Sequence, residues 1–168
     1  MQNILFLCTG NSARSILAEA ILKRVGAGRF KAFSAGSHPK SDPNPWALQL
    51  LLTLGYDTSQ YRSKSWNEFG QASAAHMKHI ITVCDNAAGE SCPFWPGRPA
   101  SAHWGIPDPA VEIGDDKDMQ LAFFTAYAHM SDRIARFVSL PIEQMSPEDV
   151  KKAMAEIGLY AGATGESR

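Results

Sequence analysis

The sequence predicts a single α/β domain, in which a mostly parallel sheet of about four strands lies between helices on both faces. Short apolar runs typical of buried strands alternate along the chain with longer segments of helical periodicity, which is the order found in parallel sheets. The chain has 168 residues and contains no linker, internal repeat or low-complexity segment. We therefore expect one three-layer domain over 1–168, with function at the carboxyl ends of the strands.

Three strands can be placed from their apolar residues. The run at 3–7 predicts a buried strand, and the aromatic alternation at 30–34 predicts a second one. Between them, residues 16–25 predict a helix because they contain neither Gly nor Pro. Residues 79–83 are rich in β-branched side chains and predict a third strand that ends at Cys84.

The remaining helices are predicted from their start signals. Asn44 followed by Pro is typical of a helix start, as is Ser146 followed by Pro. The apolar face of the first of these helices is expected to be Leu48, Leu51 and Leu52. A short helix is expected in 62–69, anchored by Trp66 and Phe69. A long helix is expected over 117–139, with a core face of Phe123, Tyr127, Met130, Ile134 and Phe137.

Two segments are predicted to lack regular secondary structure. Residues 85–110 are dominated by Gly, Pro, Asp and Asn and predict a loop of about 26 residues, and a loop of that length in a compact domain usually has a function. Three of its aromatic residues are expected to anchor it in a small satellite core, with a docking surface for a redox partner as the alternative: Phe94, Trp95 and Trp104. The Gly-rich end at 160–168 is expected to be a mobile tail.

Composition excludes several classes of function. The net charge of −1 gives no basic excess for nucleic acid, and no stretch is long and apolar enough to span a membrane. The three cysteines, Cys8, Cys84 and Cys92, are too few for a secreted disulfide framework and are expected to be reactive in a reducing compartment. We expect a cytoplasmic protein that acts as a monomer.

The segment Cys8–Ser15 is the strongest functional signal. It connects the first strand to the first helix, so its backbone N–H groups and the helix dipole would converge on a bound anion. Arg14 would add a planar fork that matches two oxygens of a tetrahedral oxyanion. The same field is expected to lower the pKa of Cys8 and make it largely thiolate near neutral pH.

This Cys-x5-Arg-Ser loop, placed directly after an N-terminal strand, resembles that of the low-molecular-weight tyrosine phosphatase superfamily. The resemblance runs from Asn3 to about Ser139 and includes Ser34-Ala35-Gly36, Ser63-Lys64-Ser65 and His103-Trp104-Gly105. It implies that family's fold and an oxyanion bound by Thr9, Gly10, Asn11, Ser12, Ala13, Arg14 and Ser15. It also implies that Asn11 orders the loop and that Ser15 hydrogen-bonds the Cys8 thiolate, although ordinary turn and cap chemistry is an alternative for both.

A general acid is also implied. Asp108, in Pro107-Asp108-Pro109-Ala110, matches the Asp-Pro of the superfamily and would protonate the leaving oxygen. The alternative is that Asp108 caps a turn, as Asp before Pro often does. Phosphatases of the superfamily usually carry a Tyr pair after the Asp-Pro, whereas this chain has Ala110-Val111. That difference favours another activity.

Hydrolysis needs neither Cys84 nor Cys92, and with these residues the chain resembles the arsenate reductases of the superfamily. Reduction of As(V) to As(III) takes two electrons, which two thiols supply as they close to a disulfide. By this resemblance Cys8 attacks arsenate with the help of Asp108, and Cys84 then attacks Cys8 and releases arsenite. Cys92 finally exchanges onto Cys84 and frees Cys8. Phosphate or sulfate would mimic arsenate in the loop.

The resemblance implies an external thiol reductant and no tightly bound cofactor. Thioredoxin and glutathione with glutaredoxin are both compatible, and three internal thiols slightly favour thioredoxin. Thioredoxin-coupled reductases often hold another Cys where this chain has Ala13. That Cys is not a relay thiol, so turnover is expected without it.

Three other functions have to be weighed. A low-molecular-weight protein tyrosine phosphatase would use Cys84 and Cys92 only as a protective disulfide. A non-enzymatic oxyanion or arsenite sensor would have no need of the acid Asp108. A zinc site could draw on Cys84, Cys92 and His103, but these lack the close Cys pairs of structural zinc, so we expect no metal. His38 and His103 could approach the site on their loops, although surface positions are the simpler expectation.

Overall fold

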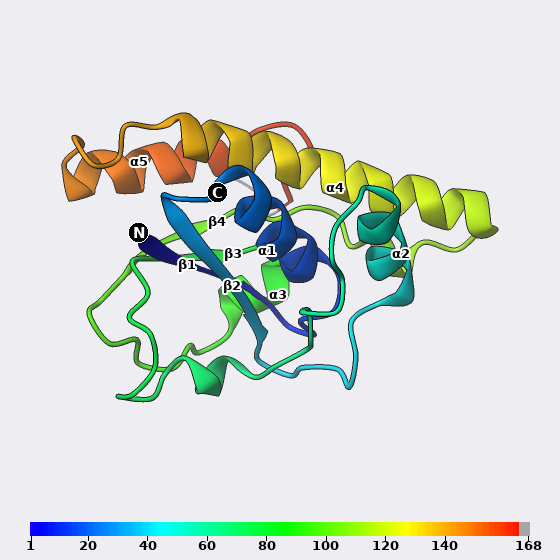
Figure 1. Cartoon of the computed structure of the whole chain (residues 1–168), viewed down its shortest axis with the longest axis horizontal. Coiled ribbons are helices and arrows are strands. Elements are labelled where there is room, and N and C mark those ends of the chain that lie inside the picture. The colour runs from blue at the N-terminus through cyan, green and yellow to red at the C-terminus, as the bar shows by residue number, and fades with distance from the viewer. Residues whose placement is uncertain (165–168) are drawn as a thin grey trace.

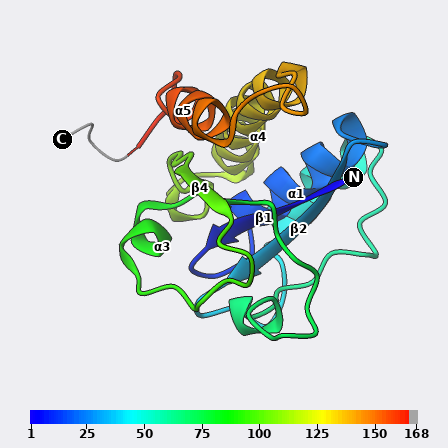
Figure 2. The ribbon, with the colours of Figure 1, turned by 90° about the vertical axis from the view of Figure 1, so that its left-hand side faces the viewer.

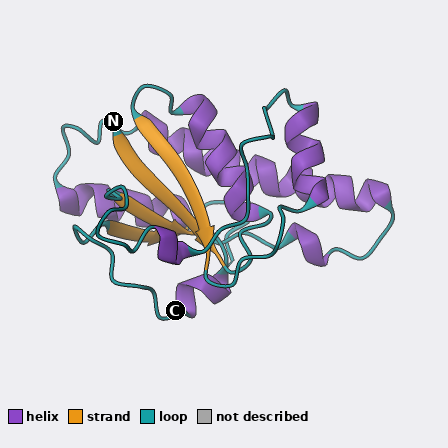
Figure 3. Cartoon of the chain, turned by 60° about the horizontal axis from the view of Figure 1, so that its bottom comes forward, coloured by secondary structure: helices purple, strands orange, loops and turns teal. Residues whose placement is uncertain are grey.

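Four parallel strands form one sheet with the order β2-β1-β3-β4 in the computed structural model, which describes residues 1–164. The strands are β1 (Gln2–Cys8), β2 (Phe30–Gly36), β3 (His79–Thr82) and β4 (Ala100–His103). Figure 3 shows them side by side, with their carboxyl ends meeting in one group of loops. The predicted α/β class with a parallel sheet is confirmed.

One face of the sheet carries the long helices. These are α1 (Arg14–Val25), α4 (Asp116–Ser139) and α5 (Pro147–Gly158), with α2 (Pro45–Thr53) beside α4 (Figure 1). The larger core lies between them and the sheet, and includes Phe6 from β1 and Phe137 from α4. Among residues 1–164, none of the helices combines the length and apolar character needed to cross a bilayer.

The other face is covered by a short helix and loops. Leu5, Leu7 and Ile80 point to this side and pack against Trp66 of the 3-10 helix η1 (Trp66–Glu68). In Figure 2 this layer lies on the opposite side of the sheet from α4 and α5. Because side chains alternate along a strand and both faces are buried, β1 is apolar at every position from Ile4 to Leu7.

The segment 85–110 contains two elements that the sequence did not indicate. Helix α3 (Asp85–Gly89) has only five residues, too few to show a helical period. Strand β4 is an edge strand, Ala-Ser-Ala-His, without a β-branched or aromatic residue, and it forms only because β3 offers a parallel partner. A further 3-10 turn, η2 (Pro109–Val111), follows.

Side-chain positions correct two other expectations. Leu52 is 58% exposed, and α2 instead buries Ala47 and Leu51, which lie one turn apart on the side that faces the core. Trp104 is fully buried in the main core, where its indole Nε1 donates to Met154 O at 2.8 Å, so it does not anchor a satellite core. Phe94 is 76% exposed. The predicted core face of α4 is confirmed.

The predicted mobile tail lies partly on 165–168, outside the described residues. Before that point the chain contacts the domain, since Thr164 N donates to Gly105 O and Thr164 Oγ1 donates to Asp85 Oδ1, both at 3.0 Å. The buried Arg133 guanidinium donates to the carbonyls of Tyr160 and Ala161, which follow α5. Mobility of this end stays a prediction.

Phe137→Ala should destabilise the domain strongly. The ring is fully buried and packs edge-on against Trp104, so its removal leaves a cavity that the surrounding core cannot fill. We expect a loss of about 3–5 kcal/mol in the free energy of unfolding, measured by urea denaturation. Phe124→Ala on the half-exposed side of the same helix is the matched control and should cost less than about 1 kcal/mol. Equal losses would contradict the described core.

His79 should make stability depend on pH. Burial, followed by the nearby Lys78, lowers its pKa to about 4, against about 6.5 in an unfolded chain. Between these values the unfolded state binds more protons, so stability is lost as the pH falls. We expect His79 to account for a loss of about 2 kcal/mol between pH 7 and pH 4.5, by urea denaturation at both values. The His79→Gln variant should lack this contribution to the loss of stability. If its stability depends on pH as that of the parent protein does, His79 is not the cause.

Candidate active site

The loop after β1 forms the floor of a cavity at the carboxyl edge of the sheet. Cys8 is the last residue of β1 and Arg14 the first of α1, and the cavity of about 220 Å³ lies over the residues between them. Its lining comprises Cys8, Thr9, Gly10, Ser12, Ala13, Arg14, His38, Lys40, Asn86, Asp108 and Ala110. A larger cavity of about 440 Å³ lies near the amino ends of β3 and β4, and no cysteine lines it. The thiol and the predicted loop therefore meet in the smaller one.

Two hydrogen-bond partners surround the Cys8 thiol. Its Sγ lies 2.8 Å from Ser15 Oγ and accepts from Asn11 N at 3.2 Å. Burial raises the pKa of Cys8 above its usual value, whereas the Ser15 hydroxyl and, more weakly, the Arg14 guanidinium lower it. The net shift of this pKa is upward, opposite to the direction expected from the sequence, because the sulfur at the end of β1 is buried and desolvation disfavours its charged form.

The Asn11 side chain hydrogen-bonds the loop to α1, to β2 and to Lys64. Its side-chain Nδ2 donates to Ser15 Oγ and to Ser34 Oγ, both at 2.9 Å, and its Oδ1 accepts from Lys64 N at 2.9 Å. Its backbone has φ 43°, a left-handed conformation that Asn tolerates better than most residues. Asn11 does not line the cavity, so it supports the loop from behind.

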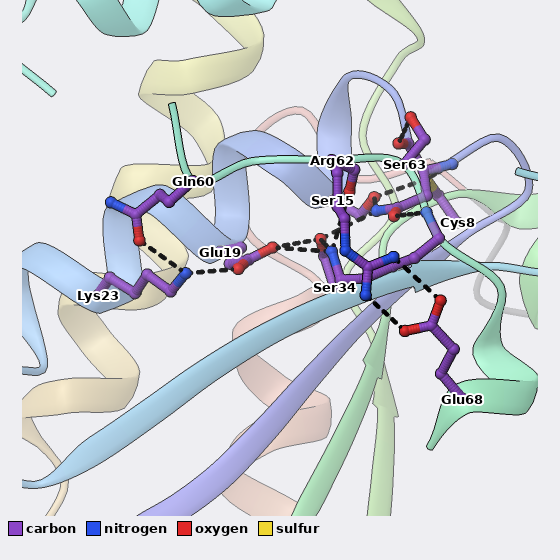
Figure 4. Close-up of polar contacts among 11 residues, drawn as sticks. Cys8, Ser15, Glu19, Lys23, Ser34, Gln60, Arg62, Ser63 and Glu68 are labelled. Atoms are coloured by element: carbon purple, nitrogen blue, oxygen red, sulfur yellow. Dashed lines mark hydrogen bonds and ion pairs between the residues drawn. The ribbon is translucent and has the colours of Figure 1, made fainter. Parts of the chain in front are cut away.

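A buried charged cluster continues from Asn11 into α1. Ser34 Oγ donates to Glu19, and Lys64 Nζ lies 3.6 Å from Glu19 Oε2 and 3.4 Å from Ser34 Oγ. Figure 4 shows Glu19 and Ser34 joined beside the loop that carries Cys8, with Lys23 on the other side of Glu19. Burial lowers the pKa of Lys64, and Glu19 counteracts this by favouring the charged ammonium.

The sequence signals for this cluster were weaker than those for the loop. Glu19 is the one charged residue in the run of eight buried residues at the start of α1, and that exception was the available signal. Lys64 and Ser34 were singled out only as parts of short motifs shared with the superfamily. Gly36 at the end of β2 has a clear steric reason, because a Cβ there would lie 2.4 Å from Thr9 O.

Arg14 and Asp108 form an ion pair at the cavity wall. Arg14 Nη2 lies 3.0 Å from Asp108 Oδ2, and Nη1 donates to Ile106 O at 3.1 Å. The second carboxylate oxygen of Asp108 accepts from Ala110 N at 3.0 Å and caps η2. Asp108 thus caps a turn and also faces the cavity, so the two interpretations of this residue are compatible.

Cys84 lies just beyond the end of β3, beside the loop after β1. Strands β1 and β3 are adjacent and parallel, with Leu7 opposite Thr82, so the residues that follow them meet at the same edge. Cys84 Sγ lies 3.7 Å from Thr9 Oγ1 and accepts from Ala87 N at 3.4 Å. The structure therefore brings Cys84 to the loop that holds Cys8, at the edge of the sheet where the sequence predicted function.

Cys92 is exposed, and it follows Cys84 in the chain on the far side of α3. Burial, followed by the Glu90 carboxylate, raises the pKa of its thiol. All three cysteines are free thiols, and no group of three or more His, Cys, Asp and Glu side chains within 1–164 is placed to hold a metal ion. His38 lines the cavity, whereas His103 bonds Asp85 at 2.9 Å and Thr82 at 2.8 Å.

Comparisons with known proteins place these residues in a family context. Residues 3–152 match the family described as low molecular weight phosphotyrosine protein phosphatase. An arsenate reductase of Halalkalibacterium halodurans is 32% identical over 134 residues, which cover 80% of this chain and 93% of that protein. A solved arsenate reductase in a phosphate-binding state is 25% identical with a TM-score of 0.67, over 83% and 98% of the two chains. The low molecular weight protein tyrosine phosphatase of T. tengcongensis shares the fold, with 20% identity and a TM-score of 0.66 over 86% and 100%.

Asn11→Ala should weaken oxyanion binding. The substitution removes three hydrogen bonds that fix the loop, each with a net contribution of about 1 kcal/mol. We expect the dissociation constant for inorganic phosphate, measured by calorimetry, to rise about tenfold or more. Asn67→Ala on η1, where Asn67 is exposed, is the matched control and should leave it unchanged. Equal affinity in the two variants would show that Asn11 does not order the loop.

Proposed function

This chain belongs to the low molecular weight phosphotyrosine protein phosphatase family, and from that premise we propose that it is an arsenate reductase. The observation that carries the proposal is the second thiol at the loop, since Cys84 Sγ lies 3.7 Å from the hydroxyl of Thr9, the residue after Cys8. A phosphatase needs only one thiol, whereas a two-electron reduction needs a pair. The arsenate reductases among its relatives match most of its length.

Cys8 performs the first step of the proposed reaction. Arsenate sits in the cavity against the backbone N–H groups of the loop, and Arg14 turns from Asp108 to the anion. The Cys8 sulfur attacks arsenic and forms an S–As bond while one arsenate hydroxyl leaves as water. The Asp108 carboxylate, released from Arg14, takes the proton that Cys8 loses and delivers it to the leaving hydroxyl, which completes the water. Ser15 and the backbone N–H of Asn11 stabilise the sulfur as it loses its proton.

Cys84 and Cys92 complete the reduction. The Cys84 sulfur attacks Cys8 Sγ, so that an S–S bond forms and the S–As bond breaks with its electron pair remaining on arsenic. Arsenite leaves as As(III), and the two thiols together have lost two electrons. Cys92 then displaces Cys8 from Cys84, which leaves a Cys84–Cys92 disulfide and regenerates the Cys8 thiol. The segment from α3 to Cys92 has to move for this exchange.

An external thiol must reopen the final disulfide. Thioredoxin is the donor that the three internal thiols favour, and glutathione with glutaredoxin is the alternative. Either donor works in a reducing compartment, so we propose that the protein acts in the cytoplasm. The proposed relay uses the three thiols of one chain and an external thiol, so we propose a monomer that acts without a tightly bound cofactor.

A phosphatase is the second candidate. Cys8, Arg14 and Asp108 line the same cavity, and these three groups are sufficient for phosphoester hydrolysis through a cysteinyl intermediate. In that case Cys84 and Cys92 would take no part in turnover.

The test is arsenate-dependent oxidation of NADPH by the purified protein. One mixture contains thioredoxin and its reductase, and a parallel mixture contains glutathione, glutaredoxin and glutathione reductase. Oxidation in either mixture supports the reductase and identifies its donor. If neither mixture oxidises NADPH and the protein hydrolyses an aryl phosphate, the chain is a phosphatase. If it binds arsenate or arsenite without any turnover, it is a sensor.

Serine substitution of each cysteine should separate the steps. We expect Cys8→Ser, Cys84→Ser and Cys92→Ser each to reduce steady-state arsenate turnover more than 100-fold, because each removes a sulfur that the relay uses. In a single turnover without reductant, Cys92→Ser should still release about one arsenite per protein, whereas Cys84→Ser should release none. Full turnover in Cys84→Ser or Cys92→Ser would refute the internal relay.

A further inference from the structure

A line of hydrogen-bonding groups leads away from Cys84. Thr9 Oγ1 lies 3.7 Å from Cys84 Sγ and 3.4 Å from Glu90 Oε1. Glu90 follows α3, the short helix that begins directly after Cys84, and is half-buried. Thr9 belongs to the loop that holds Cys8. One hydroxyl therefore links the attacking thiol to a carboxylate that the oxyanion loop itself does not use.

The direction of these bonds follows from the chemistry of the groups. An ionised carboxylate can only accept, so the single hydroxyl proton of Thr9 points to Glu90. The oxygen of Thr9 is then left to accept, and the proton of the Cys84 thiol points to it. Ala87 N donates to the same sulfur at 3.4 Å and favours a negative charge there. The arrangement is oriented for loss of the Cys84 proton toward Glu90.

We propose that Glu90, acting through the Thr9 hydroxyl, receives the proton of Cys84 when this thiol attacks Cys8. The inference rests on the proposed arsenate reductase and concerns its second step. Glu90 is a positioning residue in this step, because it orients Thr9 and takes the proton without touching the reacting sulfur. Thr9 makes that contact.

The step balances as a single transfer. The Cys84 proton moves to Thr9 Oγ1 while the Thr9 proton moves to Glu90, and the freed electron pair of Cys84 forms the S–S bond to Cys8. The S–As bond breaks, and its electron pair remains on arsenic. A thiol sulfur releases its proton readily as its electron pair enters the new bond, so a carboxylate in hydrogen-bond reach is a sufficient base. Arsenite leaves, and Glu90 later returns the proton to solvent.

The experiment isolates the second step in a Cys92→Ser background, where the relay stops at Cys8–Cys84. Reduced protein is mixed with excess arsenate, quenched in acid and alkylated with N-ethylmaleimide, and the Cys8–Cys84 disulfide is followed by peptide mass spectrometry. We expect Glu90→Gln to slow its formation about tenfold to 100-fold, near the lower end of general-base effects. Glu90→Asp keeps a carboxylate and should recover part of the rate.

A double-mutant cycle distinguishes this role from a structural one. Thr9→Val should slow the disulfide as much as Glu90→Gln, and the double variant should be no slower than either single one, because both remove the same path. Thr9→Ser keeps the hydroxyl and should recover part of the rate that Thr9→Val loses. Glu112→Gln, an exposed acidic residue next to η2, is the matched control and should have no effect.

The outcomes separate this inference from the proposed function. If the parent protein forms no arsenate-dependent disulfide, the proposed function fails and this inference fails with it. If the parent forms the disulfide and Glu90→Gln forms it equally fast, only the role of Glu90 is refuted. Additive effects of Thr9→Val and Glu90→Gln, or equal loss in Glu90→Gln and Glu90→Asp, would likewise reduce Glu90 to a structural residue.

Discussion

The hydrogen bonds of the Asn11 side chain hold the site together. They join the loop after β1 to the start of α1, to β2 and to the segment around Lys64, with three bonds of 2.9 Å. The backbone of Asn11 is in a left-handed conformation, and its N–H donates to the Cys8 sulfur at 3.2 Å. A loop without these bonds would have to be ordered by its ligand, and that ordering would reduce affinity.

The residues that pack behind this loop are restricted in charge and in size. Glu19 and Lys64 are buried charges that are tolerated because they lie close together and share Ser34. Gly36 lets β2 approach the loop where any side chain would collide with Thr9 O. The Cys8–Ser15 loop thus depends on residues from β2, α1 and the 63–65 segment that do not line the cavity. This separation leaves the cavity residues free for chemistry.

The position of Cys84 depends on both the sequence and the sheet order. The sequence places Cys8 and Cys84 where strands end, and the adjacency of β1 and β3 in the sheet brings these two strand ends together. The intervening helix α3 and the edge strand β4 could not be predicted. Five residues are too short for periodicity, and Ala-Ser-Ala-His has no intrinsic preference for a strand. Helix α3 depends on contacts with β1 and β3, and β4 depends on its pairing with β3.

The sequence by itself determined the α/β class, the Cys8–Ser15 loop, its Arg14 and the candidate acid Asp108, because spacing along the chain fixes a strand, a tight loop and a helix start. Tertiary structure alone decided how deeply the Cys8 thiol is buried and what surrounds Cys84. Burial of a strand end raises the Cys8 pKa against the local donors, and desolvation depends on what packs above the strand. Glu90 meets Thr9 across 81 residues of sequence, a contact that no local pattern encodes.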